Sequence, residues 1–187
     1  MRISFRELAG MDILAGAESG RRVLARLVEH TGLEPKSPEP LFLDFVGIEV
    51  ATASFLRESV LLFRDAVRNR RSNYYPVIAN ANELIAEELR LLCTSRGEVI
   101  MLCTLSSNGI VSDSRLAGEL DPKQRITFDL VQDRGETDAA ELMREHGEGE
   151  GVKQTAWNNR LASLAGLGLV IEISQGRAKR YKPVFER

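Results

Sequence analysis

The chain has 187 residues, of which 43% are hydrophobic and 28% are charged, and its formal net charge is −2. This composition is ordinary for a globular protein with one large or two small domains. No apolar run approaches the roughly 20 residues of a membrane-spanning helix, and residues 1–6 lack the apolar core of a signal peptide, so we expect a cytoplasmic protein that does not bind membranes.

The first half of the chain alternates between strand-like and helix-like hydrophobic patterns. Residues 41–47 form a nearly continuous apolar run, which is typical of a strand that is buried on both faces. The expected strands are residues 1–9, 41–47, 74–80 and 98–105, and the expected helices begin near residues 19, 52 and 82. This alternation predicts an α/β fold with right-handed crossovers and a partly parallel sheet.

This half resembles the STAS-like family, the relatives of the anti-anti-sigma factors. The resemblance rests on the run Leu43–Ile48 and on Ala51–Leu56, which opens a helix. It implies a domain that binds regulatory proteins, and in the better-known members a kinase-type ATPase phosphorylates a serine at this junction. That serine aligns with Ala53, which leaves Thr52 and Ser54 as candidate regulatory hydroxyls. The alternative is that Thr52 or Ser54 only caps the helix.

Few residues of the chain suggest catalysis, and no known nucleophile, zinc-protease, phosphate-loop or Cys-x-x-Cys motif occurs. Asp44 is the one unusual acid, because it lies within an apolar strand; we expect it to bond to loop amides, and a functional buried carboxylate is the alternative. Cys93 and Cys103 lack metal-ligand spacing and are expected to be reduced core residues. We therefore expect no enzyme, no metal site and no cofactor.

The second half begins with a polar stretch, residues 106–122, which we expect to connect two domains. Helices are expected over residues 124–134 and 138–145, with Thr137 capping the second. The run 147–151, rich in glycine and glutamate, is expected to be a flexible turn.

A short helix with one apolar face follows this turn. At 100° per residue, Trp157 and Leu161 share one face, whereas Thr155, Asn159 and Ser163 fall on the opposite face. The outward face therefore carries short side chains that form hydrogen bonds, and carboxamides of this kind pair with adenine.

A basic hairpin ends the chain. Residues 169–174 have the alternation of a half-buried strand, and Gln175–Gly176 supplies the turn. Residues 177–182 then hold four cations. Residues 151–187 contain seven Lys/Arg against two Asp/Glu, whereas residues 1–150 contain eighteen against twenty-five, so the charges are strongly segregated. Such asymmetry suggests a phosphate-binding end on an acidic body, although a basic hairpin can also be a solvated edge that resists aggregation.

The helix and hairpin together resemble the C-terminal half of bacterial winged helix-turn-helix regulators. The resemblance rests on Thr155–Leu161, on Leu167–Val170, and on Gly176 and Arg177 with Tyr181. It implies a small α+β domain that binds double-stranded DNA. The candidate DNA-binding residues are Lys153, Gln154, Thr155, Asn158, Asn159, Arg160, Ser163, Arg177, Lys179, Arg180 and Lys182.

The sequence therefore predicts an α/β STAS-like domain over residues 1–112 and a winged helix-turn-helix domain over residues 122–187. The first hypothesis is a transcriptional regulator that binds DNA, with the STAS-like domain sensing a signal or mediating protein contacts; many such proteins are homodimers. The second hypothesis is a protein-interaction switch that partners a kinase-type ATPase, with the winged helix used to bind protein.

Overall fold

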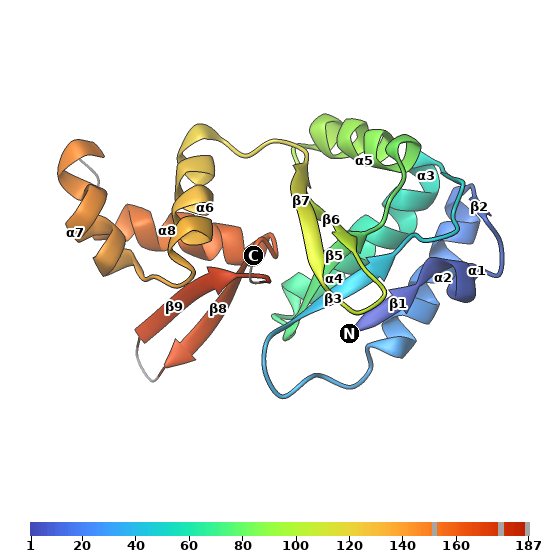
Figure 1. Cartoon of the computed structure of the whole chain (residues 1–187), viewed down its shortest axis with the longest axis horizontal. Helices are drawn as coiled ribbons and strands as arrows, with labels where there is room; N and C mark the ends of the chain where they lie inside the picture. Colours follow the sequence, from blue (N-terminus) through green and yellow to red (C-terminus); the bar gives the residue numbers. More distant parts are fainter. Residues whose placement is uncertain (151–152, 176–177, 186–187) are drawn as a thin grey trace. The chain divides into compact units, whose positions relative to one another are not determined.

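The computed structural model describes residues 1–150, 153–175 and 178–185 (Figure 1). The chain divides into two compact units, Met1–Glu119 (unit 1) and Leu120–Glu186 (unit 2). None of the helices within the described ranges is long and apolar enough to span a membrane.

Unit 1 is built around a five-stranded sheet. Its strands, in spatial order, are β1 (Arg2–Ser4), β3 (Glu39–Asp44), β5 (Tyr74–Ala79), β6 (Ile100–Leu105) and β7 (Val111–Ala117). The first four strands are parallel, and β7 is antiparallel to β6. The helices of the unit are α1 (Phe5–Ala9), α2 (Ala17–His30), α3 (Ala53–Leu56), the π-helix η1 (Arg57–Leu61), α4 (Leu62–Asn69) and α5 (Glu83–Arg96). The prediction of an α/β fold with a partly parallel sheet is confirmed.

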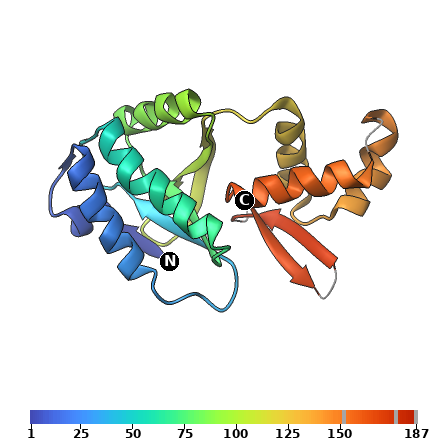
Figure 2. The same ribbon diagram turned by 180° about the vertical axis from the view of Figure 1, so that it is seen from behind.

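The main helices of unit 1 cover one face of this sheet (Figures 1 and 2). Each parallel strand pairs with the next strand of this sheet along the chain, so all the crossovers advance in one direction. Crossovers that advance in one direction with the same hand place their helices on the same side. On that side, alternate strand residues such as Ile3, Leu43 and Ile78 share one core with Leu27 of α2 and Leu89 of α5.

A second, two-stranded parallel sheet joins the loops that precede α2 and α3. It pairs β2 (Ile13–Leu14) with β4 (Val50–Ala51). The N–H of Thr52 also donates to the carbonyl of Leu14 at 2.9 Å. The starts of the two helices are thereby held together, with Thr52 at their junction.

The predicted strand over residues 1–9 is wrong beyond residue 4, because α1 follows β1 directly. Ser4 caps this helix by accepting a hydrogen bond from the Glu7 N–H at 3.3 Å. Phe5 is fully buried, and its ring stacks on Phe45 with centroids 4.4 Å apart. The alternation of Ile3 and Phe5 resembled a strand only because both side chains enter the same core.

The stretch predicted as a polar connector contains β7. Most of its residues are exposed or half-buried, and only Ala117, at 2%, is buried. Because β7 is an edge strand, it tolerates the polar and charged side chains that protect sheet edges. Its hydrophobic pattern therefore did not reveal it.

Unit 2 consists of three helices followed by an antiparallel hairpin. Its elements are α6 (Pro122–Arg134), α7 (Ala139–Glu150), α8 (Gln154–Gly166), β8 (Val170–Gln175) and β9 (Ala178–Pro183). Helix α8 contacts α6, α7 and β8. Gly168, two residues after the end of α8, has a φ of 79°, and the Leu169 N–H donates back to the Leu164 carbonyl at 3.0 Å.

Strand β9 also pairs with the segment between α6 and α7. The N–H of Thr137 donates to the Tyr181 carbonyl at 2.9 Å, and the N–H of Tyr181 donates to the Thr137 carbonyl at 2.8 Å. This antiparallel bridge joins β9 to the segment that connects α6 with α7.

Two predictions for α7 are wrong. The cap is Asp138 rather than Thr137, because Asp138 Oδ1 accepts from the N–H groups of Ala140 and Glu141, and Glu141 Oε2 accepts in return from the Asp138 N–H. The helix also continues to Glu150, into the run predicted as a flexible turn. Glycine lowers the stability of a helix but does not prevent it.

The predicted alternation of the first hairpin strand is only partly present. Val170 and Ile171 are both buried, at 0% and 2% exposure, whereas Glu172 and Ile173 are half-buried. The start of β8 contacts α8, so consecutive residues are enclosed there.

Candidate nucleic-acid interface

Helix α8 separates an apolar face from a polar one. Trp157, Leu161 and Leu164 are fully buried, which anchors the helix in unit 2. Lys153 holds the N-cap position in an extended conformation, and the Ala156 N–H donates to its carbonyl at 2.9 Å. The face opposite the core is left to solvent.

Four of the predicted DNA-binding residues lie together on this exposed face: Gln154, Thr155, Asn158 and Asn159. A groove of about 550 Å³ runs beside them, between α8, the start of α7 and β9. It is lined by Asp138, Ala139, Ala140, Gln154, Asn158, Asn159, Ala162, Lys179 and Tyr181. Three carboxamide side chains therefore lie on one open surface.

Arg160 does not belong to that surface. Its residue is only 9% exposed, and its guanidinium lies over the Trp157 ring, 4.8 Å from the centroid. This contact is a cation–π interaction on the buried side of α8. Arg160 therefore stabilises the packing of α8, and its placement argues against contact with DNA.

Ser163 is exposed, but it faces α6. Its Oγ accepts a hydrogen bond from Gln124 Nε2 at 2.8 Å. This bond links α8 to the first turn of α6, at the flank of the polar face.

The cations of the hairpin differ in their surroundings. Lys179 is exposed and its Nζ lies 2.8 Å from Glu172 Oε1. Lys182 is half-buried. Arg177 lies outside the described residues. These three residues and Arg180 are the four cations of residues 177–182.

Arg180 is enclosed by three carboxylates. Its Nε bonds to Glu136, and its Nη1 lies 3.3 Å from Asp138 Oδ2 and 3.1 Å from Glu141 Oε1. These acids flank the start of α7, so Arg180 ties β9 to α7 in parallel with the Thr137–Tyr181 bridge. A guanidinium with this many partners has little capacity left for a phosphate.

The charge of unit 2 is balanced rather than basic. Residues 120–187 contain eleven Lys/Arg and eleven Asp/Glu, because α6 and α7 carry most of the acids. The positive charge is therefore local to the hairpin and to the start of α8, and long-range attraction of DNA by the whole unit is weak.

The Arg180 cluster makes stability depend on pH. The hydrogen bond from Arg180 is the main cause that lowers the pKa of Glu141 below its ordinary value of 4.5, against the opposing effect of burial. A lowered folded-state pKa contributes stability above the unfolded value, and this contribution is lost as the pH falls through the folded value. We expect the Glu141→Gln variant to melt at a lower temperature than the wild type near pH 7, with the difference shrinking towards about pH 3. A difference that is constant across thermal melts at these pH values would contradict this role.

Thr52 and Ser54 lie at the start of α3, where the hydroxyl of Thr52 acts as a cap. Thr52 Oγ1 accepts from the Gly16 N–H at 3.3 Å and from the Phe55 N–H at 3.4 Å, and it lies 3.2 Å from Ser54 Oγ. The N–H of Ala53 donates to Glu88 Oε1 of α5 at 2.8 Å. A carboxylate of the chain thus already binds the first turn of α3.

Asp44 is 1% exposed and has several donors at the carboxyl end of β3. Its Oδ2 accepts from Arg2 Nε at 2.7 Å, and its Oδ1 accepts from Asn80 Nδ2 at 2.8 Å and from the Val46 N–H at 3.2 Å. Asn80 also bonds to both backbone groups of Leu105. The predicted bond to a loop amide is confirmed, and Asp44 further joins β1, β3 and the end of β5.

Replacing Asp44 with alanine is expected to lower the free energy of unfolding by about 2–3 kcal/mol, because buried hydrogen bonds to a charged group are lost. The Asp44→Asn variant keeps an acceptor for the Val46 N–H and is expected to lose less. Urea titrations of the two variants measure both values. An alanine variant as stable as the wild type would contradict this structural role.

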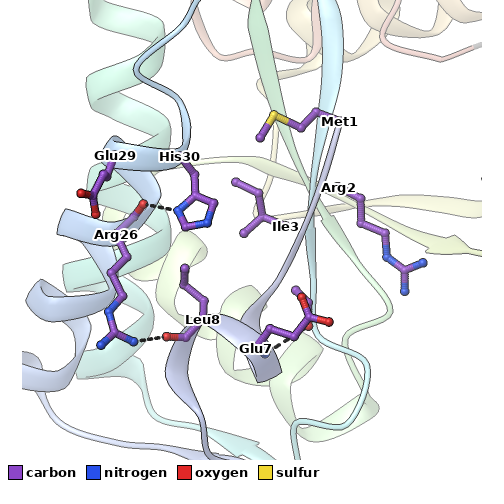
Figure 3. Close-up of a pocket in the computed structure, with 9 residues that line it drawn as sticks. Met1, Arg2, Ile3, Glu7, Leu8, Arg26, Glu29 and His30 are labelled. Carbon is purple, nitrogen blue, oxygen red and sulfur yellow. Dashed lines mark hydrogen bonds between the residues drawn. The ribbon is translucent and has the colours of Figure 1, made fainter.

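A pocket of about 400 Å³ lies between β1 and α2 (Figure 3). The side chains of Ile3, Leu8 and His30 point towards one another, whereas Arg2 extends away. The guanidinium of Arg26 donates to the Leu8 carbonyl, and His30 Nδ1 lies 2.8 Å from the Arg26 carbonyl. Arg26 and His30 are thus bonded to backbone carbonyls, and Arg2 is bonded to the Asp44 carboxylate.

Both cysteines are free and buried, as predicted. Burial raises the pKa of Cys93 to about 11 and that of Cys103 to about 12, with the nearby Asp44 adding to the second shift. These raised pKa values favour the protonated thiols at neutral pH, whereas the thiolate is the nucleophilic form.

The sequence did not reveal the acidic partners of Arg180. It also did not reveal the bond of Glu88 to the start of α3 or the bond of Asn80 to Asp44. The spacing of Asp138 and Glu141 was a usable signal, since an acid at the cap with Glu three residues later is a capping pattern. No local pattern pairs Arg180 with acids that lie about forty residues earlier.

Comparisons with models of known protein families and with curated proteins find no match to this chain.

Proposed function

We propose that unit 2 is a winged helix-turn-helix domain and that the chain is a DNA-binding transcriptional regulator. The order of elements supports this proposal: two helices with a short bridging segment between them, then α8, then an antiparallel hairpin. In such a domain α8 enters the major groove as the recognition helix, and β8–β9 forms the wing beside it.

The observation that carries the proposal is the exposed carboxamide face of α8. It is exposed, whereas the Trp157 face is buried, and it lines a groove together with Lys179 of the hairpin. Gln154, Asn158 and Asn159 can form hydrogen bonds with base edges. Lys153, Lys179 and Lys182 supply contacts to phosphates, which position the domain without reading sequence.

We further propose that unit 1 is a STAS-like domain that receives a signal or mediates pairing of two copies. The junction of Thr52 and Ser54, at the start of α3 and directly after β4, supports this part of the proposal. A dimer would place two recognition helices on one duplex and raise affinity and specificity together.

A salt titration tests DNA binding. The Lys179→Ala/Lys182→Ala variant is expected to bind all duplexes more weakly and to lower the slope of log K against log salt by roughly one unit per lost phosphate contact. Lys179 is exposed and Lys182 is half-buried, so we expect the fold to be retained, and circular dichroism checks this. A filter-binding slope equal to that of the wild type would refute the assignment of these lysines.

The second candidate is a protein-interaction switch in which unit 1 binds a kinase-type ATPase and unit 2 binds protein. The balanced charge of residues 120–187 and the enclosure of Arg180 favour it, because both reduce the attraction of unit 2 for phosphates. A gel-shift assay at low salt in which no duplex is retarded, together with recovery of an ATPase from a pull-down, would support this function over DNA binding.

A further inference from the structure

We infer that α8 reads A·T base pairs, so that the DNA site of this protein has an A·T core; the inference rests on the DNA-binding function proposed above. The side-chain chemistry of the exposed face of α8, and the burial of its one charged residue, carry this inference.

The exposed face of α8 carries two rows of side chains. Gln154, Asn158 and Ala162 follow one another at intervals of four residues, and Thr155 and Asn159 form the adjacent row. All five residues are exposed. Asn and Gln donate to N7 and accept from N6 of adenine in a bidentate pair, and the methyl groups of Ala and Thr pack against the thymine methyl. Every exposed side chain of these rows thus suits an A·T pair.

The chemistry for G·C pairs is missing from this face. Guanine is read mainly by Arg or Lys, and cytosine by Asp or Glu. Helix α8, Gln154–Gly166, contains a single charged residue, Arg160. Because Arg160 is 9% exposed and lies over Trp157, it is directed away from the DNA-facing rows.

The charged residues near α8 make contacts of their own or lie outside the two rows. Asp138 lines the groove, but it caps α7 and pairs with Arg180. Lys153 precedes the helix at its N-cap, where a long cation reaches the phosphate backbone. Lys179 belongs to β9 and pairs with Glu172. Each can add affinity, whereas the base edges are left to the carboxamides.

The length of the two side-chain rows on α8 determines how many A·T base pairs they can contact. The span from residue 154 to residue 162 covers about 12 Å of helix axis at 1.5 Å per residue. This corresponds to roughly three to four base pairs at 3.4 Å each. We therefore expect each half-site to contain a run of about this length in which A·T pairs dominate.

Selection from random duplexes at fixed salt tests this inference. The full-length chain is expected to enrich fragments that share an A·T run of three to four pairs, and replacing an enriched adenine by 7-deazaadenine, which lacks N7, is expected to weaken binding by about 5- to 150-fold. Enrichment of a G·C core, or full affinity for the 7-deazaadenine duplex, would overturn the inference while leaving DNA binding intact.

Matched variants separate the reading of bases from general affinity. Asn158→Ala and Asn159→Ala are each expected to lose the preference for adenine at one position and to keep the salt slope. Alanine favours the helix at these exposed positions, so a loss is not caused by unfolding. Lys182→Ala is the control, with a smaller slope and an unchanged preference.

Each result has a distinct meaning. Retardation of no duplex at any salt concentration would overturn the proposed function itself. An unchanged selected pool for both asparagine variants would overturn only the assignment of α8 as the reader of adenine.

Discussion

Replacing Trp157 with alanine is expected to lower the free energy of unfolding by about 3–5 kcal/mol, the usual cost of truncating a buried tryptophan. Trp157 is fully buried between α7 and α8, where its ring lies 6.5 Å from that of His146 and beneath the Arg160 guanidinium. The truncation therefore removes apolar contacts and leaves the Arg160 guanidinium without its aromatic partner. Denaturant titration followed by far-UV circular dichroism measures the loss.

The Trp157→Phe variant is the matched control. The indole Nε1 has no hydrogen-bond partner among the described residues, so phenylalanine removes volume without breaking a hydrogen bond there. We expect it to lose clearly less stability than alanine does. Equal losses for the two variants would mean that the aromatic contacts are not what holds α8 in place.

Replacing Gly118 with alanine is expected to cost about 3–5 kcal/mol, because strain and overlap act together. Gly118 has a φ of 90°, and a Cβ at this position would lie 2.0 Å from the Glu98 carbonyl oxygen and 3.0 Å from Cys93 Cβ. The obstructing atom is backbone, so the chain can relieve the overlap only by moving β7 away from the end of α5.

The Gly109→Ala variant separates the two causes. Gly109 has a similar φ of 83°, but a Cβ there would meet nothing within 4 Å. It is therefore expected to show only the cost of strain, about 1 kcal/mol. Thermal melts of both variants supply the comparison, and losses of the same size would rule out the overlap at Gly118.

Local signals predicted much of the fold. Asn82 caps α5 by accepting from the Ile85 N–H, and Gly97 ends that helix in the left-handed conformation, as their residue types indicate. The apolar runs of β3 and β5 were also visible: every residue of β5 is buried, and the second half of β3 is mostly buried. Strand β7 was not, since an edge strand needs no such run.

In the candidate interface, the sequence predicts which residues of α8 are buried, but it does not predict the partners of Arg180. The helical angle predicts the buried position of Trp157, and the same count puts Arg160 only about 60° away from it. The sequence therefore could have predicted that Arg160 lies near the buried side of α8. It was instead assigned to DNA because arginine commonly binds guanine. Arg180 differs, because its carboxylate partners meet it only after the whole of unit 2 has folded.

The pairing of Thr137 with Tyr181 bears on how the protein is synthesised. The two residues are separated by α7, α8 and most of the hairpin, so the bridge cannot form until β9 has left the ribosome. Contacts of such long sequence separation form late, because the intervening chain must first be ordered. A nascent chain that ends before residue 181 would therefore expose the apolar faces of α6 and α8, and such exposed surface is prone to aggregate until β9 has been added.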